Sequence, residues 1–125
     1  KWFQIVYDAR EDARQFIQAR LDAGEKVRGY EVDRRLKERF EQLGCAQYLM
    51  HRTGHNIGHR CHGIGANLDD YETHDDRCLL PGTMFSIEPG LYTDKYGVRL
   101  EYDVHITSEG ETKVYGPVQD EILVI

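Results

Sequence analysis

The sequence predicts an α+β fold in which two helices are followed by a mostly antiparallel sheet. Apolar residues recur at steps of three and four in the first part of the chain, which is typical of helices. In the last part they alternate with polar residues, which is typical of half-buried strands. Helices grouped before strands are characteristic of α+β folds. The 125 residues show no internal repeat and no linker, so we expect one domain.

Two glycine-terminated segments have helical periodicity. The first predicted helix spans about residues 3–23 and ends at Gly24, a residue type suited to a C-terminal cap. Its apolar face consists of Val6, Ala9, Ala13, Phe16, Ile17 and Leu21. The second predicted helix spans about residues 31–43 and ends at Gly44. Its apolar face consists of Val32, Leu36, Phe40 and Leu43.

The remaining elements are short strands separated by loops. We expect strands at 47–50, at 83–88 before Pro89-Gly90, and at 98–106, where alternation is strict. Further short strands are expected at 112–115 and 121–125. Residues 51–65 and 67–81 have no period and are expected to form irregular loops.

Composition excludes several classes of protein. Hydrophobic residues make up 40% of the chain and charged residues 30%, as in globular proteins. The net charge of −6, with both signs interspersed, argues against a nucleic-acid binder. No apolar run reaches the ~18 residues that span a membrane. The three cysteines form no CxxC pair, so we expect reduced thiols in a cytoplasmic protein.

Three motifs carry residues suited to chemistry: HRTGHNIGHRCHGIG at 51–65, SIEPG at 86–90 and VRLEYD at 98–103. Taken singly, each has an ordinary explanation as a histidine-rich surface loop, a solvated strand end or an exposed strand face. Gly54 and Gly58 argue against a zinc-binding helix through the first motif. Taken together, one histidine with Glu88 and Glu101 matches a mixed nitrogen–oxygen metal site.

The order of these motifs resembles that of the pita-bread metallopeptidases, and HRTGHNIG most resembles the Xaa-Pro aminopeptidase and prolidase branch. The resemblance spans almost the whole chain. It implies a pita-bread fold with a curved sheet, and it implies that residues 1–125 are the C-terminal part of a catalytic domain.

The resemblance also implies a role for five residues of this sequence. His55, Glu88 and Glu101 correspond to metal ligands, with Glu101 bridging two ions and Glu88 also moving protons. His62 corresponds to a residue that stabilises the tetrahedral intermediate, and His51 to one that lines the substrate pocket. The implied catalytic residues are therefore His51, His62 and Glu88.

Several positions depart from the family pattern or need interpretation. Gly63 stands where the family usually has an acidic residue, which leaves the substrate preference open. His59 stands at a usually apolar position and has no assigned role. Arg99 is expected to orient Glu101 from the same strand face.

Two aspartate ligands of the family are not accounted for by this chain. The stretch LDAGEKVRGYEVD imitates their pattern with Asp22 and Asp33. Too few residues separate Asp33 from His55 for the helix pair that the family places there, so we expect both aspartates to be solvent-facing residues near helix ends. The chain starts at Lys1 and not at Met, and we expect the missing aspartates upstream.

The function implied by the resemblance is a metal-dependent aminopeptidase, of the Xaa-Pro aminopeptidase or dipeptidase type, that uses a metal-activated hydroxide. It implies two divalent ions, manganese first and cobalt or zinc as alternatives, and a peptide substrate with proline at the second position. A homo-oligomer is compatible with the sequence. We expect residues 1–125 alone to be inactive. A non-hydrolytic binding module and a creatinase- or lyase-like enzyme on the same fold are the alternatives.

Overall fold

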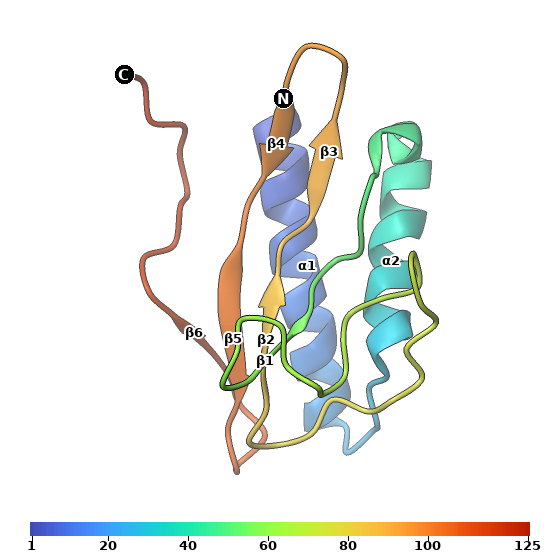
Figure 1. Ribbon diagram of the computed structural model, residues 1–125, viewed down its shortest axis with the longest axis vertical. Helices are drawn as coiled ribbons and strands as arrows, with labels where there is room; N and C mark the ends of the chain where they lie inside the picture. Colours follow the sequence, from blue (N-terminus) through green and yellow to red (C-terminus); the bar gives the residue numbers. More distant parts are fainter.

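A computed structural model describes residues 1–125, with the first helix against one side of the strands and the second helix packed beside the first (Figure 1). Helix α1 spans Trp2–Asp22 and helix α2 spans Gly29–Gln42. A single turn of 3₁₀ helix, η1, follows at Ala46–Tyr48. Neither helix combines the length and the apolar character that crossing a membrane requires.

The strands form one four-stranded sheet and one hairpin. The sheet has the order β1-β2-β5-β6, from β1 (Asn56–Ile57), β2 (Met84–Ile87), β5 (Tyr102–Ile106) and β6 (Thr112–Tyr115). The hairpin pairs β3 (Gly90–Tyr92) with β4 (Gly97–Arg99). Every pairing is antiparallel, so the predicted α+β fold with a mostly antiparallel sheet is confirmed.

The core lies between α1, α2 and the inner face of the sheet. Its fully buried residues include Val6, Ala13, Ile17, Val32, Phe40, Phe85, Ile87, Val104 and Ile106. Burying aliphatic and aromatic side chains stabilises a fold by about 1.5–3 kcal/mol each. The predicted apolar faces are confirmed except at Leu43, which is 50% exposed because it lies after the last residue of α2.

The helix ends follow the glycine signals. Gly24 and Gly44 have φ of 68° and 69°, a backbone region that strains residues with a side chain. The backbone N–H of each glycine donates to the last turn of the preceding helix, at Leu21 and Glu41. These glycines therefore end both helices as predicted.

Three strand predictions are wrong in detail. Residues 47–50 contribute to η1 and form no strand, and residues 121–125 are exposed and unpaired, because neither apolar run meets a partner strand. The predicted strand at 98–106 is interrupted at Leu100 and Glu101, which separates β4 from β5. The sequence analysis also missed β3, which continues the chain directly after Pro89.

Candidate metal centre

His55, Glu88 and Glu101 come together from three separate segments. His55 directly precedes β1, Glu88 directly follows β2, and Glu101 lies in the break between β4 and β5. Their ligand atoms all lie within 4.8 Å of one another. His55 is buried, Glu88 is half-buried and Glu101 is exposed, so the group lies at an accessible edge of the fold. The structure thus brings together the three predicted ligands.

Close backbone approach fixes the relative position of His55 and Glu88. The N–H of Ser86 donates to the carbonyl of His55 over 2.9 Å, and the N–H of Glu88 donates to the carbonyl of Thr53 over 2.7 Å. A Cβ atom at Gly54 would lie 1.9 Å from the carbonyl oxygen of Ser86. Only glycine allows this approach, which explains one of the two glycines that argued against a helix.

The facing atoms of His55 and Glu88 suit a cation. His55 Nδ1 lies 3.0 Å from the carbonyl oxygen of Asn56, so Nδ1 carries a proton and donates it. In the neutral ring Nε2 is then an acceptor, yet it faces Glu88 Oε1 at 3.2 Å. Glu88 Oε1 also accepts a hydrogen bond from Ser86 Oγ over 3.0 Å. Two facing acceptors need a proton or a metal ion between them, so this donor set fits a metal.

Electrostatics at Glu101 point the same way. Burial raises the pKa of the Glu101 carboxyl, and repulsion by Glu88 and Asp103 raises this pKa further, against a smaller lowering by Arg99 and His55. A cation beside Glu101 would relieve this repulsion. Arg99 lowers the pKa of Glu101 through its charge, without a direct hydrogen bond or ion pair between the two side chains.

His62 lies beside His55, with ring centroids 4.3 Å apart, and is exposed. His51 is held differently. Its Nδ1 donates to the carbonyl of Arg52 over 2.7 Å, and its Nε2 accepts from the Tyr92 hydroxyl over 2.8 Å. Both nitrogens of His51 are therefore engaged, which suits a residue that lines the site and not a metal ligand.

Two further polar residues shape the site and were missed from the sequence. Tyr92 holds His51 from β3, a strand that the sequence did not reveal. The Asn56 side chain accepts a hydrogen bond from the N–H of Gly65 over 3.1 Å and donates one to the carbonyl of Met84 over 3.2 Å. These two bonds tie the loop after β1 to β2. His59 is exposed, and the structure does not bring it into the group of His55, Glu88 and Glu101.

The structure explains why residue 63 is a glycine. A Cβ atom at this position would lie 2.2 Å from Asn56 Oδ1 and 2.8 Å from the backbone nitrogen of Gly58. The N–H of Gly63 also donates to the carbonyl of Asn56 over 2.9 Å. A side chain at residue 63 is therefore incompatible with this loop, because it would meet both the Asn56 side chain and the backbone of Gly58.

The expectation that Asp22 and Asp33 are both solvent-facing is right for Asp22 and wrong for Asp33. Asp33 is buried, and its carboxylate accepts from the N–H and the hydroxyl of Thr53 and from the N–H of Asp70, over 2.9, 2.7 and 2.6 Å. Burial raises the pKa of Asp33 against the lowering effect of these bonds. Its spacing from Leu36 and Phe40 placed it on the buried face, and this signal was overlooked.

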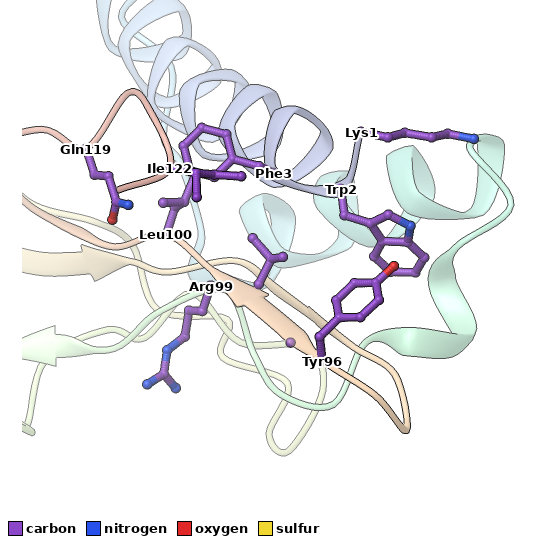
Figure 2. A pocket seen from close by; sticks show the side chains of 10 residues that line it. Lys1, Trp2, Phe3, Tyr96, Arg99, Leu100, Gln119 and Ile122 are labelled. Atoms are coloured by element: carbon purple, nitrogen blue, oxygen red, sulfur yellow. The ribbon is translucent and has the colours of Figure 1, made fainter. Parts of the chain in front are cut away.

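Two cavities lie near these elements. One, of about 470 Å³, is lined by aromatic and aliphatic residues that include Trp2, Tyr96 and Leu100 (Figure 2). None of the five predicted site residues lines it. The other, of about 450 Å³, lies between Glu101 and residues 117–123. Open space therefore adjoins the candidate centre on the side of Glu101.

Comparison with known proteins identifies relatives of this chain. The profile described as metallopeptidase family M24 matches residues 1–108. A probable dipeptidase PepE of Mycobacterium tuberculosis is 36% identical over 90 residues, covering 70% of this chain and 23% of that protein. An Xaa-Pro dipeptidase of Lactobacillus helveticus is 31% identical over 110 residues, covering 84% of this chain and 27% of that protein.

Among solved structures, a dipeptidase from Pyrococcus horikoshii superposes with a TM-score of 0.80 at 28% identity. The match covers 99% of this chain and 32% of that one. The chain thus has the fold of these peptidases throughout, but it spans only about a quarter to a third of their length.

Proposed function

The chain belongs to metallopeptidase family M24, and on this premise we propose that it is the C-terminal, metal-binding part of a peptidase that acts on Xaa-Pro peptides. The relatives it matches include proteins named dipeptidase and Xaa-Pro dipeptidase, which supports a short peptide with proline at the second position. The observation that carries the proposal is the facing pair His55 Nε2 and Glu88 Oε1, with Glu101 close to both.

The proposed ligands are His55, Glu88 and Glu101. A metal bound there would supply Lewis acidity and would lower the pKa of water. Two divalent ions that share Glu101 are part of the proposal, and the one-histidine, two-carboxylate set supports manganese over softer metals. The chain spans 23% of the mycobacterial relative, so we assign the two remaining carboxylate ligands to sequence outside residues 1–125.

The other residues act on the substrate in this proposal. Glu88 accepts hydrogen bonds and can hold a proton on its way to the leaving amine. His62 is exposed next to His55, where it can donate to a substrate carbonyl oxygen that gains negative charge. His51 is fixed by Tyr92 and shapes the wall of the site.

The three free cysteines support a reducing compartment, and we propose the cytoplasm.

The deciding experiment replaces Glu101 with Gln in the full-length protein. Glu101→Gln keeps the size of the side chain but removes the charge that the metal needs. We expect manganese-dependent hydrolysis of an Xaa-Pro dipeptide to fall roughly 100-fold or more. Loss of a residue that only hydrogen-bonds a metal ligand costs about 10–100-fold, and loss of a ligand itself should cost more. Glu72→Gln, an exposed carboxylate outside the proposed centre, is the control and should retain most activity.

Unchanged hydrolysis by Glu101→Gln would overturn the proposed function. The same assay with Xaa-Pro tripeptides separates a dipeptidase from an aminopeptidase, because only an aminopeptidase accepts the longer chain. Manganese binding without hydrolysis of any peptide would instead support a binding module.

A further inference from the structure

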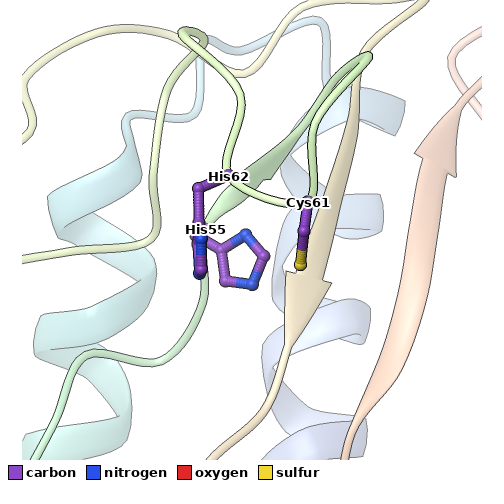
Figure 3. Close-up of side chains that lie close together, drawn as sticks. All are labelled: His55, Cys61 and His62. Carbon is purple, nitrogen blue, oxygen red and sulfur yellow. The ribbon is translucent and has the colours of Figure 1, made fainter.

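A second group of metal-ligating side chains surrounds the same histidine. The ligand atoms of His55, Cys61 and His62 all lie within 4.8 Å of one another (Figure 3). Figure 3 shows the side chains of Cys61 and His62 extending from the loop after β1 and lying beside His55. His55 is buried, whereas Cys61 and His62 are exposed. The proposed peptidase chemistry gives Cys61 no role.

The donor atoms of this group differ in kind from those of the candidate peptidase centre. A thiolate and two imidazoles are soft to intermediate ligands, and together they select Zn²⁺ over Mn²⁺. Three protein ligands leave the fourth position of a tetrahedral zinc ion for water. His55, Glu88 and Glu101 instead offer one nitrogen and two carboxylates, which suit a harder ion.

The geometry allows zinc after small side-chain rotations. Zinc bonds of about 2.0–2.3 Å place tetrahedral ligand atoms about 3.3–3.6 Å apart, and the present separations are at most 4.8 Å. Two backbone hydrogen bonds brace the loop: Gly58 N–H donates to the carbonyl of Arg60 over 3.1 Å, and Gly63 N–H donates to the carbonyl of Asn56 over 2.9 Å. Only the exposed side chains of Cys61 and His62 need to turn.

We propose that His55, Cys61 and His62 form a nitrogen–sulfur site for Zn²⁺ that competes with the peptidase centre for His55. The Nδ1 atom of His55 is engaged by Asn56, so His55 has only Nε2 for a metal and cannot serve both sites at once. Binding forms a zinc–sulfur bond, and the thiol proton leaves to the solvent without any oxidation. Zinc binding stands by itself, whereas the competition rests on the proposed function.

Cobalt titration of the reduced, metal-free, full-length protein tests the zinc site directly. Co²⁺ replaces Zn²⁺ in such sites, and a cobalt–thiolate bond gives a charge-transfer band in the near ultraviolet. We expect this band in the natural protein, its loss in Cys61→Ser, and its retention in Cys78→Ser, the matched control. Zn²⁺ should abolish the band. Absence of the band, or its persistence in Cys61→Ser, would overturn the proposal.

A second measurement needs no variant. Zn²⁺ should slow alkylation of Cys61 by iodoacetamide roughly tenfold or more, as a bound metal withdraws the free thiolate, and should leave Cys78 unaffected. Equal rates at Cys61 with and without Zn²⁺ would contradict the site.

The competition is tested by activity. Zn²⁺ should inhibit manganese-dependent hydrolysis, and Cys61→Ser should need roughly 100-fold more Zn²⁺ for the same inhibition. Equal sensitivity would remove the competition and keep the zinc site. If no peptide is hydrolysed but the cobalt band is present, the proposed function fails and the zinc site stands.

Discussion

Asp33 connects α2 to the segment that carries His55. Its carboxylate accepts hydrogen bonds from the backbone N–H of Thr53, two residues before His55, and from the N–H of Asp70, in the loop between β1 and β2. The side chain is 4% exposed, so water cannot replace these bonds if the carboxylate is lost. One residue on a helix therefore helps to position a candidate ligand, His55, that lies elsewhere in the sequence.

Replacing Asp33 with Ala should destabilise the fold by about 2–4 kcal/mol, because three donors lose their buried acceptor. Asp22→Ala is the matched control. Asp22 is exposed and accepts only from Gln18, so its loss should change stability by less than about 0.5 kcal/mol. Urea unfolding of the full-length variants measures both values, and equal values for the two aspartates would contradict the anchoring role.

Sequence reasoning identified the candidate ligands more readily than the residues that support them. His55, Glu88 and Glu101 were proposed as ligands because three motifs, each ordinary by itself, occur in the order that the family resemblance implies, and the structure brings the three residues together. Tyr92 and Asn56 were missed because their role depends on which strands and loops meet. Such contacts follow from tertiary packing and leave no local pattern in the chain.

At the scale of elements, the loop that joins β1 to Asn67 is shaped by its glycines. Gly63→Ala should destabilise this loop by about 1–3 kcal/mol, since the new Cβ would overlap the Asn56 side chain. Gly58→Ala is the matched control, because a Cβ there meets only the Cα of Gly63 at 3.5 Å. Thermal unfolding and amide exchange of residues 58–65 measure the effect; a tolerated Gly63→Ala would count against the tight loop.

The loop before β2 depends on an ionised carboxylate. Asp75 accepts from Arg77 and from the N–H of Asn67, and its pKa is lowered from 3.8 to about 2, chiefly by the Arg77 guanidinium. Because the folded pKa lies below the unfolded one, ionised Asp75 stabilises the fold above pH 3.8, and this contribution disappears as the pH falls towards 2.

We therefore expect the natural protein to be more stable than Asp75→Asn by about 2 kcal/mol near neutral pH. The difference should vanish as the pH falls from about 4 to 2. Urea unfolding of both proteins over this range provides the comparison, and a difference independent of pH would show that charge is not the cause.

Helices and strands were predictable where a regular spacing of apolar residues ended at a residue that terminates such an element. Both helices met this condition, with apolar faces that end at Gly24 and Gly44. Strands depended on partners: residues 121–125 are as apolar as β2 but stay exposed, and β3 pairs with β4 although its sequence is only three residues long. Pairing is a property of the assembled sheet, and composition alone does not determine it.

At the scale of the whole molecule, the candidate centre ties distant parts of the chain together. Its ligands come from the segment before β1, the end of β2 and the break before β5. A metal that binds only the folded arrangement stabilises it by mass action, by about 2.7 kcal/mol at a hundredfold excess over its dissociation constant.

Adding Mn²⁺ to the metal-free, full-length protein should therefore raise its melting temperature in a concentration-dependent way. Glu88→Gln, which removes the ligand charge next to His55, should abolish most of the rise. Glu72→Gln, an exposed carboxylate outside the group, should retain it. Differential scanning fluorimetry measures the melting temperature. An identical rise in melting temperature in all three proteins would place the manganese elsewhere.

The contact between Asn56 and Gly63 has a consequence for the descent of this chain. A side chain at 63 needs the space that the Asn56 side chain fills, and it also meets the backbone nitrogen of Gly58 at 2.8 Å. The glycine at 63 should therefore be inherited together with this loop. Among relatives, an acidic residue at 63 should occur only where residue 56 is smaller and the turn from 58 to 63 follows a different path.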